Sequence, residues 1–109
     1  MTTWTPISYR GFWDVPRIFL FRHQGRFYLF DCLFSEELDD YPDDYEVFLL
    51  PPDLHEENLP RSWHELSALS IARLGTVPVV AVKFDATRRK QVDVAMLDAL
   101  VPHPIRAMT

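Results

Sequence analysis

The sequence has little glycine and almost no cysteine: three Gly and one Cys occur among 109 residues. A single cysteine cannot form a disulfide within the chain, which excludes the disulfide-stabilised class of small secreted domains. Three glycines leave no glycine-rich phosphate-binding loop. No stretch approaches the ~20 apolar residues of a membrane-spanning helix, and no secretory signal pattern opens the sequence. We therefore expect a cytoplasmic protein without a membrane role.

The composition is too apolar for a disordered chain. Hydrophobic residues make up 48% of the sequence and the formal net charge is only -5. A chain of this length can bury a substantial core, and single domains commonly span about 100–150 residues. We expect one domain over residues 1–109.

Positive charge is missing from the middle of the chain. Residues 27–60 contain eleven Asp and Glu and no Lys or Arg, whereas the segments before and after it each carry a net charge of +3. Such segregation can attract a basic partner or keep a loop soluble. The one short basic run, Arg88 to Lys90, is a weak footprint for nucleic acid, so no nucleic-acid role is expected.

The clearest structural signal is a β-hairpin over residues 17–33. Two apolar runs flank a turn at Gln24-Gly25. With that turn, Phe21 faces Tyr28 and Phe19 faces Phe30. Both faces of this hairpin are apolar, so each needs a cover. The N-terminal segment and a second copy of the chain are the two candidates, and we favour a homodimer.

Further elements follow the hairpin. A strand is expected over residues 45–50, a helix from a Ser62 cap to Leu74, a strand over 77–84 and a last helix over 94–101. This order predicts an α+β fold, with a mainly antiparallel sheet of four to five strands and two helices packed on one face. A partly closed small β-barrel with appended helices is the alternative.

A run of carboxylates between the hairpin and the next strand is the first candidate site. Its members are Glu36, Glu37, Asp39, Asp40, Asp43 and Asp44. The run lacks the glycine and the spacing of a calcium loop, so no metal is expected. It is either a docking segment for a basic protein or a solvated loop that discourages edge-to-edge association of strands.

A second candidate is a polar pocket formed by separated residues. Its members would be Arg10, Asp14, Arg17, Asp31 and Arg88. Arginine beside aromatic residues can hold a carboxylate or phosphate, and an acid within an apolar strand must be paired or have a perturbed pKa. The alternative is that these groups simply pair with one another. Asp85 is expected to cap a turn, and Cys32 to be a small buried apolar residue.

No catalytic motif is present. The four histidines are scattered, no serine lies in a nucleophile elbow, and no cofactor signature occurs. The sequence thus favours a non-enzymatic protein-interaction module, possibly homodimeric, with an acidic docking segment. The alternative is a small enzyme or anionic-ligand-binding domain that uses the Arg/Asp pocket.

Overall fold

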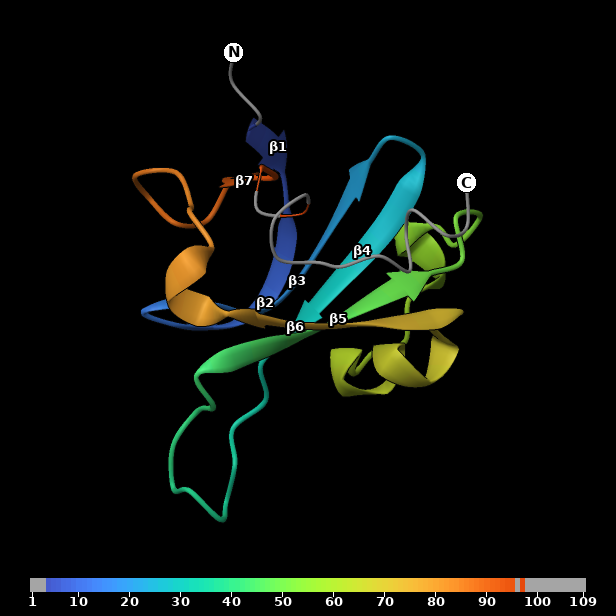
Figure 1. The fold of residues 1–109 in the computed structure, drawn as a ribbon. Helices are drawn as coiled ribbons and strands as arrows, with labels where there is room; N and C mark the ends of the chain where they lie inside the picture. Colours follow the sequence, from blue (N-terminus) through green and yellow to red (C-terminus); the bar gives the residue numbers. More distant parts are fainter. Residues whose placement is uncertain (1–3, 96, 98–109) are drawn as a thin grey trace.

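The protein is built mainly of β-strands, as the computed structural model of residues 4–95 and 97 shows (Figure 1). Five consecutive strands form one antiparallel sheet in the order β2-β3-β4-β5-β6. They are β2 (Ser8–Trp13), β3 (Val15–His23), β4 (Arg26–Asp31), β5 (Asp44–Leu50) and β6 (Ala72–Pro78). A separate pair joins β1 (Trp4–Pro6) to β7 (Gln91–Asp93). The described residues also form three 3-10 helices: η1 (Glu56–Asn58), η2 (Trp63–Leu69) and η3 (Val79–Ala81).

The predicted hairpin is confirmed, including its register. In β3 and β4, Phe21 pairs with Tyr28 and Phe19 with Phe30. Gln24 and Gly25 have φ angles of 52° and 77°, both in the left-handed region. A two-residue turn with positive φ at both positions matches the twist of the flanking strands, and glycine adopts this conformation without strain.

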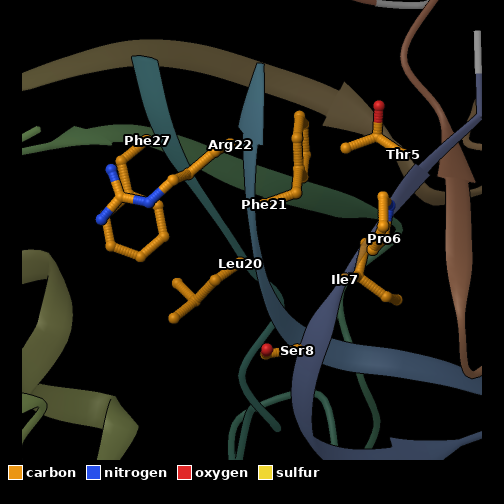
Figure 2. Close-up of a pocket in the computed structure, with 8 residues that line it drawn as sticks. All are labelled: Thr5, Pro6, Ile7, Ser8, Leu20, Phe21, Arg22 and Phe27. Atoms are coloured by element: carbon orange, nitrogen blue, oxygen red, sulfur yellow. The ribbon is translucent and has the colours of Figure 1, made fainter. Parts of the chain in front are cut away.

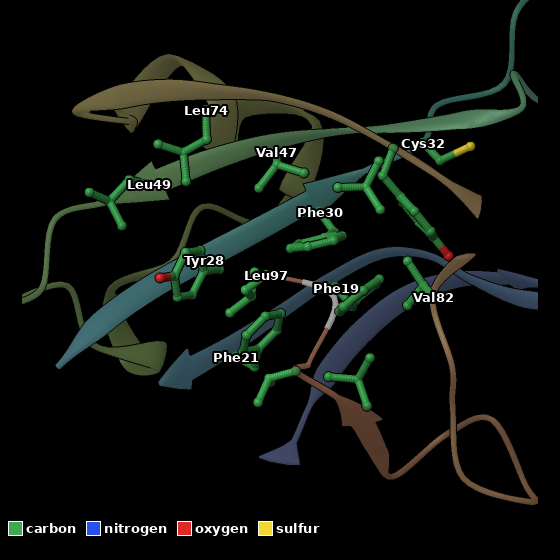
Figure 3. Close-up of a cluster of buried hydrophobic side chains, with 14 residues drawn as sticks. Phe19, Phe21, Tyr28, Phe30, Cys32, Val47, Leu49, Leu74, Val82 and Leu97 are labelled. Atoms are coloured by element: carbon green, nitrogen blue, oxygen red, sulfur yellow. The ribbon is translucent and has the colours of Figure 1, made fainter. Parts of the chain in front are cut away.

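The first face of the sheet is covered by the C-terminal part of the described chain (Figure 3). Aromatic rings of β3, β4 and β5 stack on one another there; the centroids of Phe19 and Phe30 are 4.9 Å apart. The covering residues are Val82, Phe84, Val92, Val94 and Leu97.

The second face is covered by the segment between β5 and β6. Trp63 and Leu66 of η2 pack with Leu54 and Leu59 onto the other side of the same strands. Both apolar faces are therefore covered within one chain. The reason for expecting a second copy, an uncovered face, is absent from this structure.

The α+β prediction is wrong, although an antiparallel sheet of five strands is present. Within residues 4–95 and 97, strands dominate and no long helix packs on the sheet: the expected helix over 63–74 is absent, and the one expected over 94–101 lies mostly outside the described residues. The barrel alternative is not found either, because β2 and β6 lie at opposite ends of an open sheet.

The expected helix over residues 63–74 is replaced by η2 and β6. The side chain of Ser62 caps nothing, and Ser70 has extended backbone angles that end the helical segment. Beyond it, Ala72–Pro78 pairs with β5. Trp63 and Leu66 lie three residues apart, the repeat of a 3-10 helix, so one turn is enough to place both against the sheet. Pairing with β5 overrides the local helix preference.

The expected strand over residues 77–84 is also wrong for most of its length. Pro78 is the last residue of β6, and Val79–Ala81 turns as η3. Val80 is 94% exposed, whereas the sequence predicted burial. The expected helix over residues 94–101 lies mostly outside the described residues. At its start, the carboxylate of Asp93 accepts a hydrogen bond from the Ala95 N–H at 3.0 Å.

A buried hydroxyl ties two of the strands together. Tyr45 of β5 is fully buried, and its hydroxyl donates to the carbonyl of Pro16 in β3 at 2.7 Å. Burial raises the pKa of this phenol well above its usual range.

Replacing that hydroxyl should destabilise the fold. Tyr45→Phe removes the buried hydrogen bond to the Pro16 carbonyl, and we expect the free energy of unfolding in urea to fall by about 1–2 kcal/mol. Tyr41→Phe is the matched control, because the half-buried Tyr41 hydroxyl makes no hydrogen bond to the described residues. Equal losses for both variants would contradict this account.

Candidate functional site

The acidic segment forms a loop that extends away from the sheet between β4 and β5 (Figure 1). A backbone bridge between Ser35 and Asp40 closes the tip of the loop. Asp39 has a φ of 50°, and the Asp40 carboxylate accepts the Tyr41 N–H at 2.7 Å. Local hydrogen bonds therefore shape the loop, while its carboxylates stay at the surface.

The loop between β4 and β5, the β2–β3 turn and the end of β6 border an open cleft of about 610 Å³. We call it the acidic cleft, because its lining includes four carboxylates and one guanidinium. The lining residues are Trp13, Asp14, Arg17, Asp40, Tyr41, Pro42, Asp43, Asp44, Pro78, Val79 and Val80. The cleft thus joins part of the predicted acidic segment to part of the predicted Arg/Asp pocket.

Arg17 holds one wall of the cleft in place. Its Nε donates to the carbonyl of Trp13 at 2.9 Å, and its guanidinium lies 4.3 Å above the ring of Tyr41. One terminal nitrogen also contacts the sulfur of Cys32 at 3.7 Å. The cation is therefore used to fix the loop against the β2–β3 turn.

Two apolar side chains in the lining of the cleft are largely exposed to solvent. Trp13 is 63% exposed and Val80 is 94% exposed. An exposed aromatic residue and an exposed valine beside carboxylates make a surface of mixed character, which resembles the anchor regions of protein interfaces.

The other predicted pocket residues do not all converge. Arg88 reaches the rim of the cleft and donates to the carbonyl of Asp14 at 3.1 Å. Arg10 lies elsewhere, with its guanidinium 4.4 Å above the ring of Trp63 on the second face. Asp31 is 7% exposed and lines a different hollow together with Glu46, its neighbour on β5. The five residues therefore form no single pocket.

The remaining acidic candidates lie on the loop outside the cleft lining. Glu36, Glu37 and Asp39 are exposed there. They add to the negative potential near the cleft without lining it.

The Cys32 thiol is buried and lacks the setting of a nucleophile. Its sulfur donates to the carbonyl of Pro42 at 3.4 Å. Burial raises the pKa of the Cys32 thiol, and this effect exceeds the opposing influence of the Arg17 guanidinium. Through its hydrogen bond to the Pro42 carbonyl, the thiol helps to hold the loop between β4 and β5 in position.

Asp85 organises the loop before β7, as the sequence predicted. One carboxylate oxygen accepts the N–H groups of Arg89, Lys90 and Gln91, and the other accepts the Thr87 hydroxyl at 2.7 Å. The Thr87 hydrogen bond is the main cause that lowers the pKa of Asp85 to about 2.

An apolar hollow of about 280 Å³ lies between the N-terminal strands and the hairpin (Figure 2). Arg22 at its side stacks on the ring of Phe27 at 4.0 Å and donates to the carbonyls of Pro52 and Leu54. Its charged group is thus used to hold the chain after β5, and the hollow offers few polar groups that could orient a ligand.

No family model, curated protein or solved structure matches this chain. Within residues 4–95 and 97, no group of three or more His, Cys, Asp or Glu side chains is arranged to hold a metal ion. The same part of the chain has no helix that is long and apolar enough to cross a membrane. The geometry of the acidic cleft is therefore the main guide to function.

Sequence reasoning missed Val80 as a surface residue. The run from Val77 to Phe84 suggested a buried strand, but Pro78 interrupts it. A proline within an apolar run is itself a signal against a continuous central strand, so the exposed turn could have been found.

We expect Cys32 to react slowly with iodoacetamide in the folded protein. A buried thiol with a raised pKa has little thiolate, so alkylation near neutral pH should be at least about tenfold slower than in urea. Mass spectrometry of the alkylated chain measures both rates. Equal rates in the two states would show an exposed, activated thiol.

The Asp85 carboxyl should titrate near pH 2 in the folded protein when followed by NMR. Because this pKa is depressed, its contribution to stability is present above the ordinary aspartate value of ~4 and is lost as the pH falls towards 2. Thr87→Val removes the main hydrogen bond and should raise the midpoint. An unchanged midpoint would contradict the assignment.

Proposed function

We propose that this chain is a non-enzymatic protein-interaction module whose acidic cleft binds a basic segment of a partner protein. The observation that carries the proposal is the charge of the cleft. Its lining includes Asp14, Asp40, Asp43 and Asp44 against one cation, Arg17, which is held by the Trp13 carbonyl and the Tyr41 ring.

Negative charge exceeds positive charge at the cleft, even with Arg17 in its lining and Arg88 at its rim. Among the described residues, no lysine or arginine forms an ion pair with Asp40, Asp43 or Asp44. A cleft lined by charges of one sign attracts a partner of opposite charge and speeds the association of the two proteins. A lysine or arginine side chain would gain these interactions without breaking an existing ion pair.

The apolar residues favour a protein segment over a small cation. Trp13 and Val80 lie beside the carboxylates and remain largely exposed. Aromatic anchors within a polar rim are typical of protein interfaces. The expected occupant therefore combines a basic side chain with an apolar one.

The alternative, an enzyme or a domain that binds an anionic ligand, has less support. Arg10 and Arg17 lie at different places and contact the rings of Trp63 and Tyr41 respectively. Four carboxylates around Arg17 would repel a phosphate, and the same charges disfavour nucleic acid.

We propose a cytoplasmic location for this module. Its support is the buried thiol of Cys32, which makes no disulfide and is compatible with a reducing compartment. Fractionation of the source cells tests this location.

The acidic cleft is tested by neutralising its carboxylates. The double variant Asp40→Asn and Asp43→Asn keeps the oxygen that accepts the Tyr41 N–H and leaves the Asp43 backbone unchanged. Tagged wild-type and variant proteins are recovered from the source cells, and bound proteins are quantified by mass spectrometry. We expect a basic partner to be depleted by at least about tenfold with the variant.

The matched control is Asp53→Asn with Glu57→Gln, which removes the same charge at exposed positions outside the cleft. This control should retain the partner. Equal recovery by the cleft variant and the wild type, or equal loss with both variants, would overturn the docking role.

A further inference from the structure

The strand β6 offers an open edge beside the acidic cleft. It is the last strand of the sheet and pairs with β5 on one side only. Across residues 4–95 and 97, no backbone hydrogen bond from another segment reaches Arg73 to Pro78 on the other side. Such an edge can accept a further strand.

The ladder shows which backbone groups of β6 point outward. The Val79 N–H donates to the Asp43 carbonyl at 2.8 Å, so this pair is of the hydrogen-bonded kind. Paired positions alternate along an antiparallel ladder, and Thr76 stands opposite Glu46 at a non-hydrogen-bonded position. The N–H and carbonyl of Thr76 therefore point away from β5. The carbonyl of Pro78 points the same way.

The opposite edge of the sheet is less suited to pairing. In β2, Gly11 has a φ of 64° and has no partner in the ladder, although the pairs on either side of it keep the same register. In β6, the irregularity lies at Gly75, which has a φ of 137° and borders a register shift; from Thr76 to Pro78 the register with β5 runs without interruption. The regular part of the β6 edge is thus the part next to the cleft.

This edge leads directly into the acidic cleft. Pro78, Val79 and Val80 line the cleft and continue the chain of β6. A segment paired with β6 would therefore end beside Pro78 and Val79, at the cleft that Asp43 and Asp44 line from the other side of β6. Charge complementarity at that end favours a basic segment.

We propose that an extended segment of a partner protein adds to β6 as a sixth strand, antiparallel, with its basic residues at the amino end. This inference rests on the proposed function of the cleft. Because β6 runs towards the cleft, an antiparallel strand has its amino end there, and antiparallel pairing continues the pattern of the sheet. A lysine or arginine at that end meets the carboxylates, while the backbone pairs with Thr76.

The experiment uses two synthetic peptides of the same composition. One has arginine and lysine at its amino end, followed by alternating valine and threonine; the other has the reversed sequence. Binding of each labelled peptide to the intact protein is measured by fluorescence anisotropy. We expect the first peptide to bind at least about tenfold more tightly than the reversed one.

Two changes test the backbone pairing itself. Thr76→Pro removes the outward N–H at an edge position where proline is tolerated, and should weaken binding by at least about tenfold relative to Thr76→Ser. If Thr76→Pro does not fold, N-methylated peptides replace it. Methylation of one alternate set of amides should abolish binding, and methylation of the other set should leave it intact.

The outcomes separate the two proposals. If Asp40→Asn with Asp43→Asn abolishes binding but Thr76→Pro, reversal and N-methylation have no effect, strand addition is wrong and the acidic cleft remains. If neither peptide binds, or the cleft variant binds as well as the wild type, the basic-segment function itself fails. If the wild type sediments as a dimer that Thr76→Pro converts to a monomer, a second copy occupies the edge and the proposal is overturned.

Discussion

The burial of strands β3 and β4 on both faces is the constraint on which the rest of the structure depends. Phe19 and Phe30 pack on one face and Leu20 and Leu29 on the other, and all four are almost completely buried. Each such side chain contributes about 1.5–3 kcal/mol when removed from water. Two other segments therefore cover these faces: residues 54–66 cover one, and residues 82–94 with Leu97 cover the other. The loop between β4 and β5 adds buried Cys32 and half-buried Tyr41 to the cluster on the first face, and its carboxylates stay at the surface.

The sequence allowed the hairpin to be predicted because its signals are local. The Gln24-Gly25 turn sets the register, and the apolar runs on either side agree with it. The segment from Trp63 to Leu74 was mispredicted because its outcome depends on a distant partner. Ala72–Pro78 gains the hydrogen bonds of β5, and this gain exceeds the small preferences that favour a helix. The sequence alone does not show that Ala72–Pro78 becomes the second neighbour of β5, on the side away from β4.

The candidate site was predictable in its composition and not in its arrangement. The acidic residues of the loop were found because they form a dense run, but nothing in the sequence indicated that Asp40 and Asp43 would line one cleft with Trp13 and Val80. The meeting follows from strand order: β3, β4 and β5 are neighbours, so the turn before β3 and the loop after β4 reach the same end of the sheet. The Arg17 side chain then contacts Cys32 and Tyr41, residues that are far from it in sequence.

The carboxylates that, on the proposed function, attract a basic segment would also disfavour self-association at β6. If two copies paired antiparallel about Thr76, their acidic clefts would lie within a few residues of the same axis, at a spacing of about 3.3 Å per residue. Like charges at that separation repel, and the net charge of -5 on each copy adds to the cost. A basic strand reverses the sign of this interaction at the same edge. If the proposed function holds, the acidic loop would both protect the sheet from edge-to-edge association and admit a partner, so the two interpretations of the acidic segment are compatible.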